Sequence, residues 1–473
     1  MTSCQNGGAW VTNQQEATDG EYRVGAGADQ GEPTGRARPG DGRAGLPGTR
    51  ARLARPRELD PAVTVALFVR QVVHGNCPCA EVRHLAGPSS SFTAQAYCEA
   101  RRRLPLAVYQ DLLGEVIGVV LPQQTRRGEF LWHGHRTFHI DGSSFSMPDT
   151  PELRKAFGTP PGQQPGCGFP CAHLLVLFSA STGLLVDAWA SPLRTGDVAQ
   201  VGEAHLHLDA GDVLIGDDTF GTYAHLAMLQ QQGLHGLFPA HHRRIVDFAK
   251  GRPHTAEGPD ARAGLPRSRW VRSLGREDQV VEYFKPKGVP LWMSKEQYDA
   301  LPASILVREL RRTVRRPGLG RVTLTLVTTL LDPEAYPAAD LLELRLRRWD
   351  VETNLGHIKT TMGLDVLRCK SEQGVRKELA VFCLVYNLVR AVMLEASRRQ
   401  EVPVGRISFA DVLHWMKHAG PGDGLPAFIV NPHRPDRAEP RCKKRRPKPY
   451  DLMNKPRDTL RKNLRKPAEK QLT

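Results

Sequence analysis

The stretch VLIGDDTF, residues 213–220, decides the fold class of this 473-residue chain. An apolar run that ends in glycine and two acids is typical of a buried strand whose last side chains emerge at the sheet edge. Around it, alternating or apolar runs predict strands over 136–142, 173–181, 184–191 and 236–242, and helices over 198–210 and 220–233. Three strands followed by helix, strand, helix and strand predict an α/β core.

The rest of the chain differs in composition from this core. Residues 1–56 are rich in glycine, proline and arginine and lack apolar periodicity, so we expect them to be disordered. Composition and pattern divide the remainder into a helical region, two parts of the core, a β-rich insertion between those parts, and a basic disordered tail. These segments are 57–125, 126–242 with 332–425, 243–331, and 426–473.

The helical region has the spacing of a helix-turn-helix. We expect one helix after the N-cap Asp60, a short second helix that ends at Gly87, and a third between Ser91 or Thr93 and Pro105. The third helix has polar and basic side chains suited to DNA, namely Gln95, Tyr97, Arg101, Arg102 and Arg103. The alternative is a small helical bundle with a solvated arginine face.

The charge of the chain indicates an anionic partner. It has 65 Lys and Arg against 50 Asp and Glu, a net +15, and residues 434–473 hold 15 basic and 5 acidic residues, a net +10. Such a tail suits phosphate backbones, or it is a solubilising segment. The most apolar stretch, Leu379–Leu394, contains Asn387 and Arg390 and is shorter than the ~20 residues of a membrane span. We therefore expect a cytoplasmic protein without a membrane partner.

The nine cysteines do not form a secreted disulfide framework, because their number is odd and they are scattered. Cys167, Cys171 and His173 have the spacing of half a zinc site, but no second pair with suitable spacing follows. The alternative is a Gly/Pro-rich loop with reduced thiols.

Three carboxylates stand out by context. Asp141 lies on a predicted strand in FHIDGSSF, Asp217 ends VLIGDDTF, and Glu352 lies within LRLRRWDVETNLGHIKTTMG on a predicted helix over 338–362. On a continuous helix, Glu352 would share one face with three cations, Arg345, Arg348 and Lys359. Ordinary i,i+4 pairing on a solvated face is the alternative explanation.

Together, IDGSS, IGDDTF and an Arg-x3-Glu-x6-Lys helix resemble the DDE transposases of the IS4 family of insertion sequences. The family pattern around the glutamate is Tyr-x2-Arg-x3-Glu-x6-Lys, and this chain departs from it only at the tyrosine, which is Arg345. The resemblance covers roughly residues 60–425. It implies an RNase H-like mixed-sheet core interrupted by a β-strand insertion.

The resemblance also implies the roles of the site residues. Asp141, Asp217 and Glu352 would hold two Mg²⁺ ions, which Mn²⁺ may replace, because hard divalent cations prefer carboxylate oxygens. Arg348 and Lys359 would bind phosphates near the cleaved DNA end, and Arg345 could add another such contact. A tryptophan of the insertion would stack on a flipped base, and Trp292 is favoured over Trp270. The alternative for each is a half-buried tryptophan on a strand.

The function implied is cut-and-paste DNA transposition. A homodimer in a synaptic complex would bind double-stranded DNA through the terminal inverted repeats of the element, cut there, and join the ends to target DNA. The alternatives are an RNase H-fold nuclease that does not join ends and a catalytically silent DNA-binding protein. Asp218 should point away from Asp217 on a strand, and His241 and His242 are expected to be surface histidines.

Overall fold

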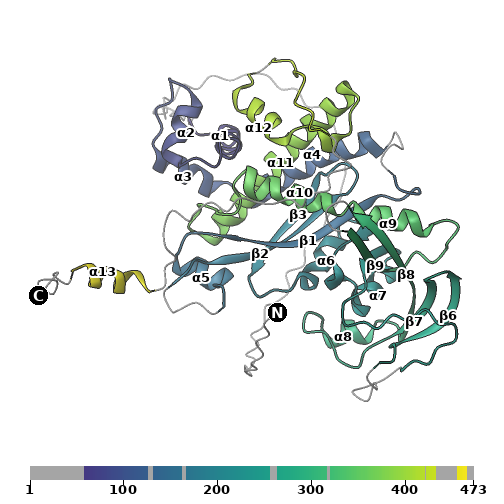
Figure 1. The fold of residues 1–473 in the computed structure, drawn as a ribbon. Helices are drawn as coiled ribbons and strands as arrows, with labels where there is room; N and C mark the ends of the chain where they lie inside the picture. The colour runs from purple at the N-terminus through teal and green to yellow at the C-terminus, as the bar shows by residue number, and fades with distance from the viewer. Residues whose placement is uncertain are drawn as a thin grey trace, which may run out of the picture. The chain divides into compact units, whose positions relative to one another are not determined.

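A nine-stranded sheet organises the protein, seen in a computed structural model (Figure 1). The structure describes residues 58–125, 131–161, 167–255, 264–316, 320–420, 422–432 and 455–465. In spatial order the strands are β3 (Leu185–Pro192), β2 (Cys171–Ser179), β1 (Thr137–Ser146), β4 (Val213–Ile215), β5 (His235–Pro239), β9 (Gly320–Thr328), β8 (Ser304–Arg316), β7 (Asp278–Phe284) and β6 (Ser268–Gly275).

The sheet is mixed, as predicted. β1 pairs parallel with β4, and β4 pairs parallel with β5, whereas β2 is antiparallel to both β1 and β3. The order 3-2-1-4-5 of the first five strands confirms the RNase H-like core. The four strands of the insertion extend the same sheet, because β9 pairs antiparallel with β5.

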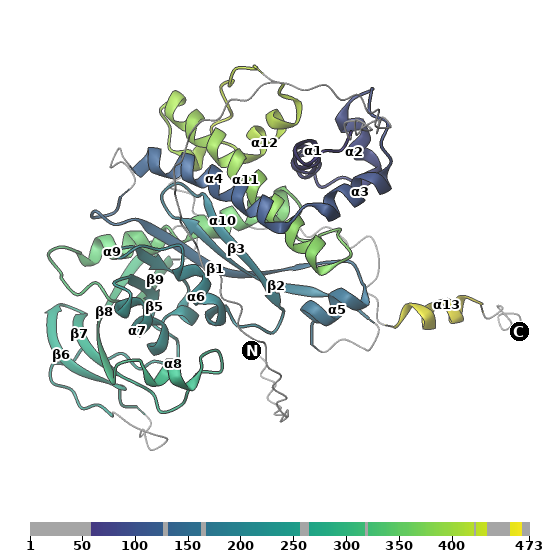
Figure 2. The ribbon, with the colours of Figure 1, turned by 180° about the vertical axis from the view of Figure 1, so that it is seen from behind.

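Helices cover both faces of the core strands (Figures 1 and 2). The main helices are α1 (Pro61–Val73), α2 (Cys79–Ala86), α3 (Ala94–Arg103), α4 (Leu106–Thr125), α5 (Pro151–Phe157), α6 (Val201–His205), α7 (Tyr223–Gln231), α8 (Lys295–Asp299), α9 (Ala338–Leu346), α10 (Trp349–Gly356), α11 (Glu372–Gln400) and α12 (Phe409–His418). Because strand side chains alternate between faces, Phe138 and Ile140 of β1 join a cluster with α6 and α7. Phe145 of β1 packs on the opposite side with α4, α10 and α11.

Helix α11 is long and apolar enough to cross a bilayer by length and composition alone, but 78% of its most apolar window is buried inside the protein. Its two polar interruptions pair with the turn between β2 and β3. The Asn387 amide bonds both backbone groups of Leu185, and the Arg390 guanidinium donates to the Thr182 carbonyl. These bonds orient α11 on the sheet, so it is a core helix.

The three N-terminal helices begin and end where they were predicted. Asp60 accepts from the Val63 N–H at 2.7 Å, and Thr93 caps α3 by accepting from the Ala96 N–H. The set of side chains expected to face DNA was wrong for two members. Tyr97 is fully buried, and Arg101 lies over the Phe68 ring.

Arg101 instead forms part of the junction between these helices and the core. Its guanidinium donates to Cys369 Sγ at 3.0 Å and to Gln71 Oε1 at 3.2 Å. Periodicity cannot separate a helix face that meets solvent from one that meets another part of the same protein. Gln95, Arg102 and Arg103 remain exposed.

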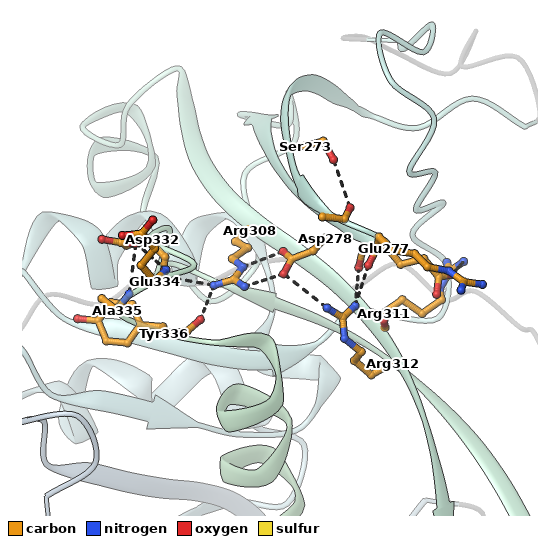
Figure 3. A network of polar contacts seen from close by, with 12 residues as sticks. Ser273, Glu277, Asp278, Arg308, Arg311, Arg312, Asp332, Glu334, Ala335 and Tyr336 are labelled. Atoms are coloured by element: carbon orange, nitrogen blue, oxygen red, sulfur yellow. Dashed lines mark hydrogen bonds and ion pairs between the residues drawn. The ribbon is translucent and has the colours of Figure 1, made fainter.

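One buried arginine fastens the insertion to the core (Figure 3). Arg308 of β8 donates to both oxygens of Asp278 on β7, at 2.8 and 2.6 Å. Its remaining nitrogen donates to the carbonyl of Tyr336 at 2.7 Å, in the turn that leads from β9 into α9. The insertion therefore holds the start of the segment that continues to Glu352.

Three predicted elements differ in the structure. The single helix over 338–362 is divided into α9, α10 and a π-helical turn, His357–Thr361, because the chain tightens between Arg345 and Val351 through i→i+3 bonds. The helix predicted over 198–210 is only a 3₁₀ turn, Asp197–Gln200, and α6. Within the tail predicted to lack structure, Arg457–Arg465 form α13, with Asp458 in its first turn beside Arg461. The predicted disordered segment 1–56 lies outside the described residues.

Candidate active site

The first candidate acid lies in the middle of β1. Asp141 follows His139 and precedes Ser143 on the strand face that turns towards α9 and α10, and 15% of its side chain is exposed. Its Oδ1 accepts from the Gly142 N–H at 3.1 Å. A carboxylate at such a position needs a cation or donors nearby.

Arg348 supplies that cation and links two of the candidate acids. Its Nη1 donates to Asp141 Oδ2 at 3.2 Å, and its Nη2 donates to Glu352 Oε1 at 3.1 Å. The arginine precedes α10 at the tight turn after α9, so the guanidinium reaches back to β1. Two carboxylates that lie far apart in the sequence thus share one guanidinium.

Asp217 follows β4, beside β1 in the sheet. Its Oδ1 accepts from the backbone N–H and the hydroxyl of Thr219, at 2.9 and 2.5 Å. Burial raises the pKa of Asp141 to about 6, the charge of Arg348 opposes this rise, and the nearby negative charge of Asp217 adds to it. The site therefore holds more negative charge than Arg348 alone compensates.

Lys359 joins this group from the π-helical turn. Its Nζ donates to the Ser143 hydroxyl at 2.9 Å and lies 3.3 Å from an oxygen of Asp365. The π-turn is closed by a bond from the Met362 N–H to the His357 carbonyl. Lys359 lies in this turn, from which its side chain reaches β1.

Arg345 has different surroundings from the other two cations. It lies on α9, half-buried, and its charge acts with that of Arg348 on His139. Burial, followed by these two charges, lowers the pKa of His139 to about 3. Among the described residues, neither ring nitrogen of His139 has a hydrogen-bond partner. The four residues predicted on one helix face are thus spread over α9, the tight turn, α10 and the π-turn.

The two candidate tryptophans lie in the insertion, and no described contact joins either to the acidic group. Trp292 is half-buried and packs on the apolar cluster that includes Tyr223 and Met293. Trp270 lies on β6, and its buried indole nitrogen has no partner among the described residues. The preference for Trp292 stays a prediction.

The donor set of Asp141, Asp217 and Glu352 fits hard divalent cations. All three offer carboxylate oxygens, and burial, the largest cause of the raised pKa of Asp141, makes its charged form costly without a cation. The three do not form a tight group, since Arg348 lies between two of them. In the described ranges, the group of three whose ligand atoms all lie within 4.8 Å of one another is Asp218, His241 and His242.

The sequence analysis did not predict this second group. It did expect Asp218 to point away from Asp217, and the two side chains do have different partners. Asp218, which follows β4, has its Oδ2 3.6 Å from Nδ1 of His242, which follows β5. The run HHRR after a strand was its only signal. Cys167, Cys171 and His173 do not meet as zinc ligands among the described contacts: His173 contacts Asp197 at 2.5 Å, and the Cys171 thiol donates to a backbone carbonyl.

Comparison with known proteins gives a transposase family model and two proteins named as transposases. The family described as Transposase DDE domain matches residues 132–388, a span that contains all three candidate acids. The chain is 25% identical over 346 residues to Transposase InsG for insertion sequence element IS4 of Escherichia coli (strain K12), covering 67% of this chain and 70% of that protein. It is 29% identical over 112 residues to the Putative transposase InsZ of the same organism, covering 23% of this chain and 38% of InsZ.

A solved structure, the piggyBac transposase synaptic complex with hairpin DNA, aligns with a TM-score of 0.37 and 9% identity. The alignment covers 75% of this chain and 70% of that one.

Proposed function

The chain belongs to the IS4-type family of DDE transposases, and we propose that it cuts DNA at the ends of an insertion sequence and joins those ends to target DNA. The observation that carries the proposal is the Arg348 guanidinium between Asp141 and Glu352, residues from opposite ends of the family match. Asp217, which follows the neighbouring strand β4, is the third acid of the proposed set.

Asp141, Asp217 and Glu352 would hold two Mg²⁺ ions, or Mn²⁺ in their place. When bound, two such ions activate the attacking hydroxyl or water and stabilise the leaving oxygen of an in-line displacement at phosphorus. Burial of Asp141 and the proximity of Asp217 favour occupation by cations, because each makes the isolated carboxylates costly.

Arg348 and Lys359 would then hold the DNA strand. The Arg348 fork is suited to two oxygens of a phosphate once the acids are occupied by metal. Lys359, on the Ser143 hydroxyl beside Asp141, would hold a neighbouring phosphate as a point charge. Arg345, half-buried on α9, would attract the DNA through its charge without contacting it. Trp292, in the insertion, would contact a base.

The N-terminal helices would bind the inverted repeats. In support, α3 exposes Gln95, Arg102 and Arg103 while its buried side fixes it to the core. The family resemblance further implies that two copies bring two ends together. Light scattering of the protein with end-bearing duplexes should then give two protomers for every two ends, and one protomer per complex would exclude this assembly.

The test uses purified protein, Mg²⁺ and a DNA fragment carrying both ends of the element with their flanks. We expect double-strand cleavage at the ends and joined products with a supercoiled target. Glu352→Gln should abolish both, while Glu343→Gln, which changes an exposed glutamate of α9, should leave both unchanged. Full cleavage by Glu352→Gln would contradict the assigned site.

Two other outcomes separate the alternative functions. Cleavage without any joined product would identify a nuclease. Binding of the ends without cleavage, in Mg²⁺ and in Mn²⁺, would identify a silent DNA-binding protein.

A further inference from the structure

A basic cavity includes in its lining Asp218, the residue that follows the candidate acid Asp217. Its volume is about 610 Å³. It is also lined by the loop after β5 and by the end of β7 in the insertion. Core and insertion therefore both contribute to its wall.

Three arginines line this cavity, Arg243, Arg244 and Arg267. Across the described part of the chain, none of them forms an ion pair with a carboxylate. Other arginines of the insertion are engaged: Arg308 pairs with Asp278, and Arg252 donates to Ser268. Unpaired guanidinium groups in a concavity are a site for an anion.

Hydrogen bonds hold in place the tyrosine on which one of these arginines lies. The Arg244 guanidinium lies 3.9 Å from the centre of the Tyr283 ring. The Tyr283 hydroxyl donates to Glu309 at 2.8 Å, and Gln279 donates to the other oxygen of the same carboxylate at 2.8 Å. Glu309 is fully buried, so this network fixes the platform on which Arg244 rests.

Among the described lining residues, the single carboxylate, Asp218, lies near a histidine. Asp218 Oδ2 lies 3.6 Å from His242 Nδ1, and His241 Nδ1 accepts from the Arg243 N–H at 3.2 Å. Among the described contacts, Asp218 forms no ion pair with the three arginines. The cavity has a net positive wall one residue away from a candidate catalytic acid.

We propose that this cavity binds a phosphodiester of the substrate DNA strand next to the bond that is cut. The inference rests on the proposed function, since it requires that the bond cut lies at Asp217. Arg243 and Arg267 would contact the phosphate oxygens from the exposed rim, and Arg244 would contact them from the Tyr283 platform. The contact reads no base, so it holds the strand without adding sequence preference.

The test compares two double variants that remove the same charge. Arg243→Ala/Arg267→Ala alters the cavity rim, while the control Arg398→Ala/Arg399→Ala alters exposed residues at the end of α11. Affinity for an end-bearing duplex is measured by fluorescence anisotropy over a range of KCl. The cavity variant should lower the slope of log affinity against log salt by about two, and the control should lower it by less than about one.

A second measurement locates the contact on the DNA. A neutral methylphosphonate replaces one phosphodiester at a time on either side of the cleaved bond. Wild-type protein should lose about tenfold in affinity at one or two adjacent positions, as expected for a lost charged hydrogen bond. The cavity variant should no longer respond at those positions, whereas the control should respond as the wild type does.

The outcomes separate the two proposals. If wild type cuts and joins ends but the cavity variant keeps the full pattern of sensitivity, the phosphodiester site is wrong and the transposase function stands. If wild type cuts no end-bearing DNA, the proposed function fails first. Arg244→Lys keeps the charge but not the planar stack, and should lose part of the same sensitivity; an unchanged pattern would exclude Arg244 from the contact.

Discussion

Two arginine–aspartate contacts in this protein have opposite designs. Arg308 and Asp278 are 1% and 4% exposed, form two parallel bonds, and use the remaining nitrogen on a backbone carbonyl (Figure 3). Arg348 and Asp141 are 16% and 15% exposed and share one bond, with the other nitrogen on Glu352. The first contact is closed and bidentate, and the second is open and divided between two acids.

Under the proposed function, this difference means that one kind of ion pair serves stability in one place and chemistry in another. A buried bidentate pair whose three guanidinium nitrogens all donate is costly to break, because either partner left alone is an uncompensated charge. A guanidinium divided between two carboxylates beside water can be exchanged for metal ions and then used for a phosphate. The four predictions below test this comparison in order of decreasing effect.

Arg308→Met should lower the free energy of unfolding by about 3–5 kcal/mol, because it leaves Asp278 buried with only Arg312 at 3.8 Å. Urea unfolding followed by fluorescence measures the change. Arg308→Met/Asp278→Leu should regain part of the loss, since it removes both charges. A loss below about 1 kcal/mol in the single variant would mean that the closed pair is not a stabilising element.

Arg348→Met should reduce end cleavage about 100-fold, as for the loss of one preorganised donor in a transition state. Its free energy of unfolding should fall by less than in Arg308→Met, because Asp141 and Glu352 are 15% and 41% exposed whereas Asp278 is 4% exposed. Gel assays of single-turnover cleavage and the same urea titration measure the two effects. A large loss of stability with normal cleavage would reverse the comparison.

Asp141→Asn should stabilise the metal-free protein, increasingly so as pH rises. The folded pKa of about 6 lies above the ordinary value of 3.8, so ionising Asp141 costs stability as pH rises through this window, and the cost is constant above it. The advantage of the variant should grow by about 1 kcal/mol between pH 5 and 7.5.

Thermal unfolding in EDTA at several pH values measures the advantage of Asp141→Asn. Mg²⁺ should stabilise the wild type more than Asp141→Asn, because binding to the native state adds to its stability. If the stability difference between variant and wild type does not depend on pH, ionisation of Asp141 is not what costs stability.

Arg347→Ala should have the smallest effect, about 0.5 kcal/mol or less in unfolding and none in cleavage. Arg347 is next to Arg348 in the sequence but pairs with Glu343 on the surface, where the two side chains are 62% and 68% exposed. Calorimetry and the cleavage assay provide the baseline for both contacts. A cleavage defect here would show that the tight turn itself, rather than the Arg348 guanidinium, is what matters.

The sequence was sufficient for features that depend on local pattern. Strands and caps such as Asp60 follow from periodicity and capping preference, and the ordered set of three acids was implied by the resemblance to the IS4 family. The α/β class and the RNase H-like core were predicted correctly. The roles of Asp141, Asp217 and Glu352 stay predictions until the cleavage assay is done.

Features that depend on tertiary contacts could not be predicted. Nothing in the local pattern indicates that the helix over 338–362 tightens at Arg348, or that this residue contacts a carboxylate on β1 that lies 207 residues away in the chain. Arg101 looked like a DNA contact because helical periodicity does not identify the partner of a face. Asp218 and His242 meet only because β4 and β5 are neighbours in the sheet.

The pairing of β5 with β9 has a consequence for how this protein can change over generations. Since the insertion returns through a strand that borders the core, its removal would leave β5 as an open edge that invites aggregation. The insertion is therefore not a module that can be removed without affecting the core sheet. Core and insertion must be inherited together, and grafting a foreign insertion would succeed only if the donor supplies a strand that completes the same ladder.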